Sequence, residues 1–168
     1  MKNIEIKSVG SESAHLIVDI HFDSVHKGNA SLFYGEEILN DWSPPVSEHR
    51  VNEFRSRISE TQPIAVIAYD DELPIGFGIF DLKQQRIGAI YVKAAYNNRH
   101  VGVSLLNYLE KMAIQNGCEK LHLDSSLNAR GFYEKHGYLS ISEGFFSLPS
   151  GIQMKSVSMS KMLTNLSS

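Results

Sequence analysis

The sequence lacks several features by which other classes of protein are recognised. Its single cysteine, Cys118, has no partner for an internal disulfide, which is typical of a protein kept in a reducing compartment. No run approaches the roughly eighteen apolar residues that a membrane-spanning helix needs. Residues 1–10 also lack the apolar core of a secretory signal. We therefore expect a cytoplasmic protein that has no membrane partner.

An excess of basic residues is absent too. The chain has 16 Lys and Arg against 19 Asp and Glu, a formal net charge of −3. General nucleic-acid binding needs a broad basic surface and is therefore not expected. With 168 residues the chain is long enough for one substantial core and too short to argue for two, so we expect a single domain over residues 1–168.

Metal-ligand spacing is missing as well. Three histidines, His15, His21 and His26, fall in or near the first expected helix. Two ligands on one helix face would stand four residues apart, and these do not. We expect no metal site, and a surface or substrate-facing role for these side chains.

What is present is an ordered series of strand and helix patterns. Period-two alternation predicts strands, and apolar residues at three- and four-residue spacing predict helices. Helix starts are expected at Ser11 or Ser13 and at Ser47, whose side chains can cap them. The expected strands are 2–8, 63–69, 75–80, 87–92 and 120–124, followed by a hairpin of 145–148 and 152–159, and the expected short helices are 36–42 and about 127–136.

Two glycines leave one face of a predicted strand without side chains. They are Gly76 and Gly78, in the strand that precedes 87–92 in an antiparallel meander. A bare strand face predicts the close approach of another backbone or of a ligand.

The chain is organised around residues 87–117, which predict a strand, a polar loop and a helix. The first N–H groups of a helix lack intrahelical partners and lie at the positive end of its dipole. The loop 97–102 therefore predicts a site for an anion such as a pyrophosphate, held by backbone N–H groups of about 98–103. Arg99 and His100 would add charge. The alternative is a polar helix cap with surface side chains.

Two motifs, in this order, resemble the GCN5-related N-acetyltransferase (GNAT) superfamily. In the first, a Gln/Arg-x-x-Gly-x-Gly/Ala loop, Asn97 stands at the Gln/Arg position, His100 at the first glycine and Gly102 at the second. A histidine there costs little in right-handed helical backbone but is strained at positive φ. The second is roughly Asn-x-x-Ala-x-x-Phe-Tyr-x-x-x-Gly-Phe; it is matched by Ala129, Phe132, Tyr133 and Gly137, with Tyr138 for Phe and Ser126 for Asn.

The resemblance implies an α/β (α+β) fold. It consists of a mixed, mostly antiparallel sheet of about six to seven strands with helices on both faces. The central parallel pair of strands is splayed apart, and the gap seats the pantetheine arm of acetyl-CoA, the implied co-substrate.

The resemblance also implies roles for individual residues. A main-chain N–H near Tyr91 or Val92 would polarise the thioester carbonyl, and Tyr133 would be the general acid for the leaving thiolate. Otherwise Tyr133 is a core aromatic, and Ser126 and Asn128 are helix caps. The residues expected to bind acetyl-CoA are Tyr91, Val92, Asn97, Asn98, Arg99, His100, Val101, Gly102, Val103, Ser104, Ser126 and Asn128.

The resemblance further implies that the region between the first two strands forms much of the acceptor pocket, and residues 29–45 of this region are rich in aromatic and acidic side chains. Candidate substrate contacts are Tyr34, Glu36 and Trp42, from a wider set that includes Phe33, Glu37 and Asp41. The alternative is that the aromatics close the core and the acids are solvated. The general base is left open, because Gly88 stands where many relatives carry a carboxylate; the candidates are Glu36, Glu37, Asp41, His26, His122 and Asp124.

The implied function is an N-acetyltransferase that moves an acetyl group from acetyl-CoA to a primary amine of a small molecule, peptide or protein by direct attack. The alternative is a non-catalytic acyl-CoA-binding regulator, which the altered loop with Asn97 and His100 favours. Phe132 and Tyr133 favour the enzyme, because a binding module has no use for a thiolate acid. The oligomeric state stays open, with a homodimer as one alternative.

Overall fold

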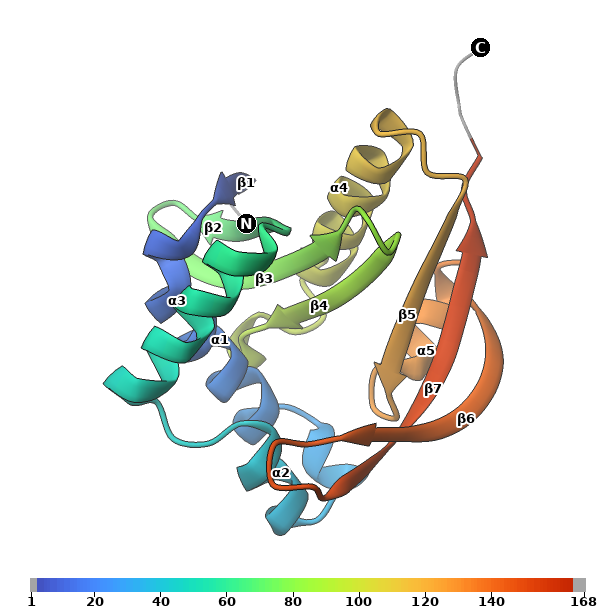
Figure 1. Cartoon of the computed structure of the whole chain (residues 1–168). Coiled ribbons are helices and arrows are strands. Elements are labelled where there is room, and N and C mark those ends of the chain that lie inside the picture. Colours follow the sequence, from blue (N-terminus) through green and yellow to red (C-terminus); the bar gives the residue numbers. More distant parts are fainter. Residues whose placement is uncertain (1–2, 165–168) are drawn as a thin grey trace.

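The computed structural model describes residues 3–164, which form a mixed sheet with helices on both faces (Figure 1). The sheet has seven strands in the order β1-β2-β3-β4-β5-β7-β6. The strands are β1 (Ile4–Val9), β2 (Ile64–Asp70), β3 (Leu73–Asp81), β4 (Arg86–Val92), β5 (Lys120–Ser126), β6 (Leu139–Ser147) and β7 (Gln153–Met162). All neighbours are antiparallel except β4 and β5.

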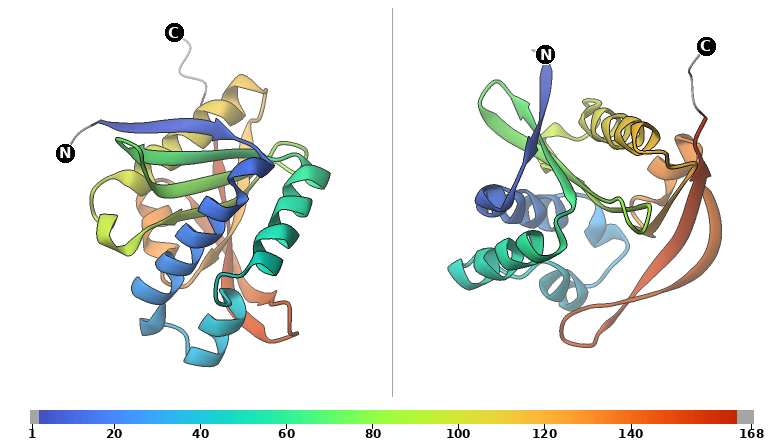
Figure 2. Two further views of the ribbon diagram at one scale, coloured as in Figure 1. Left: turned by 90° about the vertical axis from the view of Figure 1, so that its left-hand side faces the viewer. Right: turned by 45° about the horizontal axis from the view of Figure 1, so that its top comes forward.

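The helices form two layers. The α-helices are α1 (Ala14–Lys27), α2 (Glu36–Trp42), α3 (Glu48–Thr61), α4 (Val101–Gln115) and α5 (Arg130–Lys135), with short 3-10 turns η1 (Ser11–Ser13), η2 (Ala30–Leu32) and η3 (Ala94–Tyr96). The apolar face of α4 packs with Val66 and Phe80, whereas α1 and α3 pack on the other face, with Ile67 and Phe77 (Figure 2). Burying these side chains holds both layers on the sheet.

The central parallel strands separate along most of their length. β4 and β5 share one register pair, Arg86 with His122, next to a hydrogen bond from the His122 N–H to the Gln85 carbonyl at 3.0 Å. On its other edge, against β3, β4 carries a bulge. Ala89 pairs with Ile79, and Ile87 pairs with the adjacent residue, Phe80, so Gly88 is left unpaired. The expected mixed sheet with a splayed parallel pair is confirmed.

Several predicted element ends are confirmed and others are corrected. The helix 36–42 has the expected bounds, and the Ser47 hydroxyl caps α3 by accepting the Arg50 N–H at 3.1 Å. Capping of α1 by a serine side chain is wrong, because the turn η1 precedes it and Ser13 makes no side-chain cap bond. The closing hairpin is longer than expected. Because β6 is exposed along its whole length, it shows none of the burial alternation by which a strand is predicted, and its full extent was missed.

The helix expected from about 127 also begins later. It starts at Arg130, because residues 126–129 form a turn in which the Ala129 N–H donates to the Ser126 carbonyl at 3.1 Å. This turn follows the end of β5 and carries Asn128.

The bare strand face of Gly76 and Gly78 is covered by α4. A Cβ on Gly78 would lie 2.9 Å from the Leu109 side chain, and one on Gly76 would lie 3.1 Å from Leu105 and from the Tyr91 carbonyl oxygen. The face is therefore closely approached, but by side chains of a helix and not by the further backbone or the ligand that was expected. Within residues 3–164 no helix is long and apolar enough to cross a membrane.

Candidate active site

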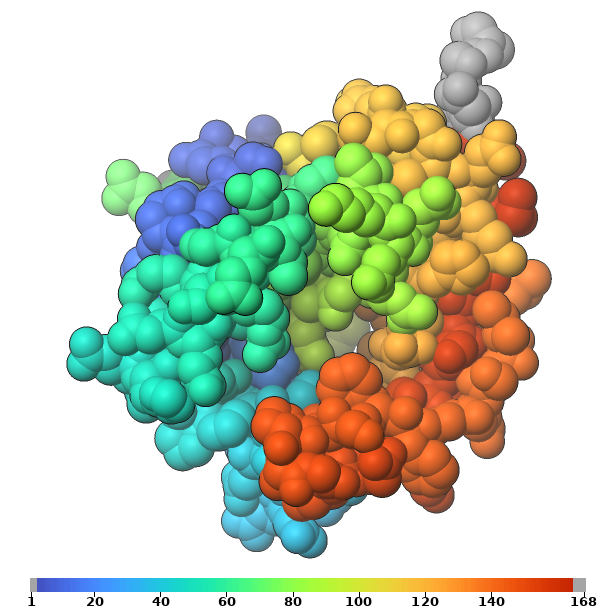
Figure 3. All heavy atoms as spheres, in the orientation of Figure 1, coloured from blue at the N-terminus to red at the C-terminus, as the bar shows by residue number. Residues whose placement is uncertain are grey.

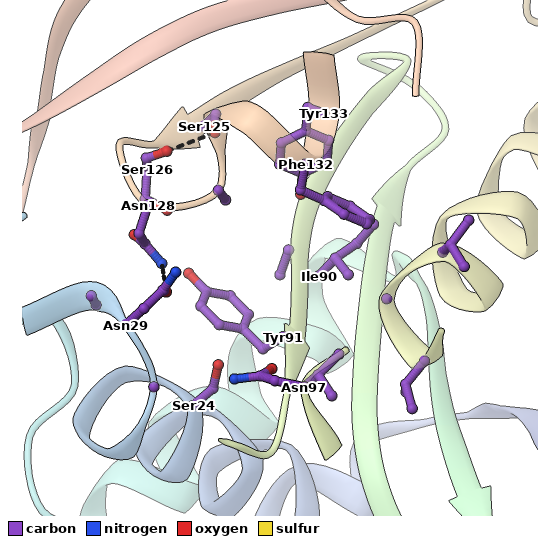
Figure 4. Close-up of a pocket in the computed structure, with 18 of the residues that line it drawn as sticks. Ser24, Asn29, Ile90, Tyr91, Asn97, Ser125, Ser126, Asn128, Phe132 and Tyr133 are labelled. Carbon is purple, nitrogen blue, oxygen red and sulfur yellow. Dashed lines mark hydrogen bonds between the residues drawn. The ribbon is translucent and has the colours of Figure 1, made fainter. Parts of the chain in front are cut away.

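A cleft of about 580 Å³ opens between the separated ends of β4 and β5. It is lined by the end of α1, by β4, by the start of α4 and by the segment from β5 to α5 (Figure 4). A second cavity of about 220 Å³ adjoins it and reaches β6 and β7. The surface in Figure 3 is hollowed between the turn that joins β3 to β4 and the β6–β7 hairpin. Residues that line both cavities are Trp42, Ile87, Gly88, Tyr91, Asp124 and Ser126.

The start of α4 offers unpaired backbone donors to the cleft. The first helical hydrogen bond runs from the Ser104 N–H to the His100 carbonyl at 3.1 Å. Within the described part of the chain, no acceptor takes the N–H groups of 98–103. Such donors at a helix start, with the helix dipole behind them, form a site for an anion.

The loop backbone is left-handed at two positions. Asn98 has φ 61° and His100 has φ 64°. Asparagine tolerates this region, but histidine is strained there, so the penalty attached to positive φ at position 100 applies.

Most of the loop residues expected to bind the co-substrate line the cleft, but two do not. Those that do are Asn97, Asn98, His100, Val101, Gly102 and Val103. Arg99 lies over the Tyr96 ring, 5.4 Å from its centroid, and the Ser104 hydroxyl donates to the His100 carbonyl at 2.8 Å. These two side chains are therefore engaged by the protein outside the cleft.

Strand β4 presents a main-chain donor to the gap. The Lys93 N–H donates to the Ile75 carbonyl of β3 at 2.9 Å. Because hydrogen bonding alternates along an antiparallel strand, the Tyr91 N–H also faces β3, whereas the N–H of Val92 faces the gap. Of the two positions expected to polarise a thioester, Val92 has the free donor.

Tyr133 of α5 presents its phenol to the cleft (Figure 4). The side chain is 6% exposed, and its hydroxyl has no hydrogen-bond partner among residues 3–164. Burial, and then repulsion from the Tyr91 phenolate, raises the pKa of Tyr133. The phenol therefore stays protonated through the neutral range and can donate a proton.

Asn128 carries an unsatisfied acceptor in the cleft. Its side-chain nitrogen donates to the Asn29 side-chain oxygen at 3.1 Å, but its own oxygen is buried without a partner. A buried acceptor left unpaired is costly, so the site fits a ligand with an amide N–H, such as the pantetheine arm. Sequence reasoning did not single out Asn29 or Ser24, which line the cleft from the end of α1 because of the tertiary packing alone.

The three expected substrate contacts are placed differently from one another. Trp42 lines both cavities. Tyr34 lines neither: its hydroxyl donates to the Lys155 carbonyl at 2.6 Å and accepts the Leu127 N–H at 2.8 Å. Glu36 is exposed at the start of α2 and also lies outside both cavities.

One of the candidate bases lines the cavities. Among residues 3–164, Asp124 is the only carboxylate in the lining of either cavity. Its two oxygens accept from Arg86 at 2.8 Å and from the Ser158 hydroxyl at 2.9 Å. Glu36, Glu37, Asp41, His26 and His122 line neither.

A polar cluster that sequence reasoning did not find supports the aromatic wall. His21 lies against the Tyr91 ring at a centroid distance of 4.4 Å. Its Nδ1 accepts from the Arg50 guanidinium at 3.0 Å and bonds to the Ser43 hydroxyl at 2.8 Å. Burial, and then the positive charge of Arg50, lowers the pKa of His21 to about 3, so the imidazole is neutral. Residues 3–164 contain no group of three or more His, Cys, Asp or Glu placed to hold a metal.

Comparisons with known proteins agree with this geometry. The chain is 33% identical over 124 residues to the uncharacterized N-acetyltransferase YjcF of Bacillus subtilis (strain 168), which covers 73% of this chain and 84% of that one. A GCN5-related N-acetyltransferase structure from Rhodopseudomonas palustris matches with a TM-score of 0.86 and 28% identity, over 97% of this chain and 98% of that one. The PaiA N-acetyltransferase of Thermoplasma acidophilum, solved with coenzyme A, shares the fold with a TM-score of 0.71 and 21% identity, over 95% and 99%.

The fold and these likenesses define the class as an acetyltransferase. The model of the Acetyltransferase (GNAT) family matches residues 33–138, and the chain belongs to this family. It is therefore an acetyl-CoA-dependent N-acetyltransferase.

Proposed function

We propose that this chain, as one domain, moves the acetyl group of acetyl-CoA directly to a primary amine of a small molecule, peptide or protein. The observation that carries the proposal is the gap between β4 and β5, which has unpaired N–H donors of 98–103 at one end and the Tyr133 phenol beside it. The N–H groups of 98–103 would hold the pyrophosphate, and the orphan oxygen of Asn128 would accept an amide N–H of the pantetheine.

Bound acetyl-CoA supplies an activated acetyl group as a thioester. The Val92 N–H points into the gap and would stabilise the negative charge that develops on the carbonyl oxygen, without having to reorient. The Tyr133 phenol would give its proton to the departing sulfur, because a thiol of pKa about 8.5 holds a proton well at neutral pH. The amine would approach from the second cavity, which meets the cleft at Tyr91 and Asp124.

The test combines binding and turnover. Acetyl-CoA at one hundred times its dissociation constant should stabilise the chain by about 2.7 kcal/mol, seen as a shift of the thermal midpoint. Release of free CoA over a panel of amines should accompany it. Stabilisation without turnover of any amine would instead support a non-catalytic acyl-CoA-binding regulator, which the strained His100 of the loop favours.

A further inference from the structure

The second cavity has its own chemistry. Its walls are the aromatic and apolar side chains of Trp42, Tyr91, Phe146 and Met154, which come from α2, β4, β6 and β7. The rings of Trp42 and Tyr91 lie 6.1 Å apart. At about 220 Å³ it is smaller than the roughly 300–1,000 Å³ of a drug-sized site. Its size and lining suit a short arm that ends in one ring or a branched alkyl group.

Among the described residues that line it, the charged side chains are Arg86 and Asp124. Leu121 and Leu123 of β5 pack on the α4 face, so strand alternation turns Asp124 to the other face. In β4, the bulge at Gly88 places the Ile87 side chain on the α4 face and so turns Arg86 to the opposite face. The Arg86 guanidinium there lies 2.8 Å from the Asp124 carboxylate. Each of the two side chains is 38% exposed, so the carboxylate remains accessible from the cavity.

We propose that the second cavity selects primary amines with a short aromatic or apolar arm, and that Asp124 anchors the ammonium group and takes its proton. This proposal rests on the proposed acetyl transfer and adds the acceptor class and the base. Asp124 lines both cavities, so an amine held by it stands where the two meet. A polyamine would bring a second ammonium group, and the lining residues that the structure describes include no second carboxylate for it.

Every proton and electron pair in the proposed transfer has a donor and an acceptor. The ammonium loses one proton to Asp124, which passes it to solvent. The nitrogen lone pair then forms the N–C bond to the acetyl carbon while the C–S bond breaks and its electron pair stays on sulfur. The sulfur takes a proton from Tyr133, and the second proton lost by nitrogen restores the phenol through water. The products are the acetamide, CoA thiol and one proton in solution.

The apolar walls are tested with adjacent residues of β6. Phe146 lines the cavity, whereas its neighbour Phe145 does not and projects from the opposite face of the strand. With CoA bound, we expect Phe146→Ala to weaken binding of 2-phenylethylamine, followed by calorimetry, and to raise its KM at least 10-fold. Phe145→Ala should change neither. Equal effects of the two variants, or turnover of peptides and polyamines but not of 2-phenylethylamine, would overturn the acceptor class.

The role of Asp124 is tested with two amines of similar arm and different basicity. At neutral pH an alkylamine such as 2-phenylethylamine, with a pKa near that of lysine at about 10.4, is almost fully protonated, whereas the α-amine of phenylalaninamide, near 7.7, is not. We expect Asp124→Asn to lower kcat/KM about 100-fold for the first amine and less than 10-fold for the second. Equal losses for both amines would overturn the base assignment.

Controls separate this proposal from the transfer itself. Glu143→Gln removes another ion-paired carboxylate, 80% exposed and outside both cavities, and should leave both amines unaffected. The thermal shift with acetyl-CoA should persist in Asp124→Asn. If that variant does not fold, the double variant Arg86→Gln with Asp124→Asn is compared on the same two amines, because it leaves no unpaired guanidinium. Absence of the thermal shift in the parent chain would overturn the proposed function itself.

Discussion

The hydroxyl of Tyr34 accepts the backbone N–H of Leu127 at 2.8 Å. The same hydroxyl donates to the Lys155 carbonyl at 2.6 Å. One side chain near η2 thus joins the turn after β5 to strand β7. The turn carries Ser126 and Asn128 into the cleft, so Tyr34 acts on the site through their placement.

Replacing Tyr34 by Phe should therefore lower stability. Both backbone groups lose their partner, and we expect a loss of about 1–3 kcal/mol in the free energy of unfolding, measured by urea titration. Tyr69→Phe is the control, because that hydroxyl has no partner in residues 3–164. Unchanged stability together with a higher KM for the amine would show that Tyr34 contacts the acceptor, as the resemblance implied.

Replacing Tyr133 by Phe should lower kcat about 100-fold or more while acetyl-CoA binding is kept. The thermal shift measures binding, and CoA release measures turnover. Tyr138→Phe is the matched control: its ring lies 5.6 Å from that of Tyr133, but its hydroxyl donates to Glu110 and lines neither cavity. That variant should lose stability and keep its turnover.

The raised pKa of Tyr133 also predicts the form of the pH profile. The protonated phenol is favoured in the folded chain, so the acid persists until the pH exceeds the ordinary tyrosine value of about 10. Turnover of the parent enzyme should show no alkaline decline from this group below that pH. A decline near pH 8 that disappears in Tyr133→Phe would contradict the assignment.

Position 100 should tolerate glycine better than any branched residue. Removing the Cβ relieves left-handed strain of about 1–2 kcal/mol, and the greater freedom of the unfolded chain offsets about 0.4–1 kcal/mol of it. We expect His100→Gly to match or exceed the parent thermal midpoint, and to keep the shift with acetyl-CoA. His100→Val should lose about 1–3 kcal/mol. Equal stability of the two variants would show that this backbone is not left-handed in solution.

Acid should destabilise the fold through His21. Its folded pKa of about 3 lies below the ordinary value of 6.5, so only the unfolded chain binds a proton between these pH values. The contribution is present above pH 6.5 and is lost as the pH falls toward 3, with a slope of up to about 1.4 kcal/mol per pH unit. Urea titrations across this range measure it.

His21→Gln is the variant for this prediction. Glutamine can accept from Arg50 but does not titrate, so the slope should become shallower. His49→Gln, at a side chain 84% exposed, is the control and should keep the parent slope. A slope that is the same in the parent and in His21→Gln would contradict the lowered pKa of this partly buried imidazole.

Local patterns predicted much of the fold. The helix 36–42 and the Ser47 cap depend on residues within a few positions of one another, and the bare face of Gly76 and Gly78 depends on strand alternation. The loop before α4 and the Phe132-Tyr133 pair carried the resemblance, and the family is confirmed. These features are legible in a sequence because their causes are local.

The sequence by itself determined the order of the elements, the family and the unpaired donors at the start of α4. Only the tertiary structure decided which side chains meet. It brought Tyr34 into hydrogen bonds with Leu127 and Lys155, which lie 93 and 121 positions away along the chain. It also placed Asp124, alone among the candidate bases, in the lining of both cavities. The physical reason is that a bulge at one unpaired glycine and the separation of two strands set which faces oppose each other. Contacts at such distances along the chain depend on packing that no local pattern encodes.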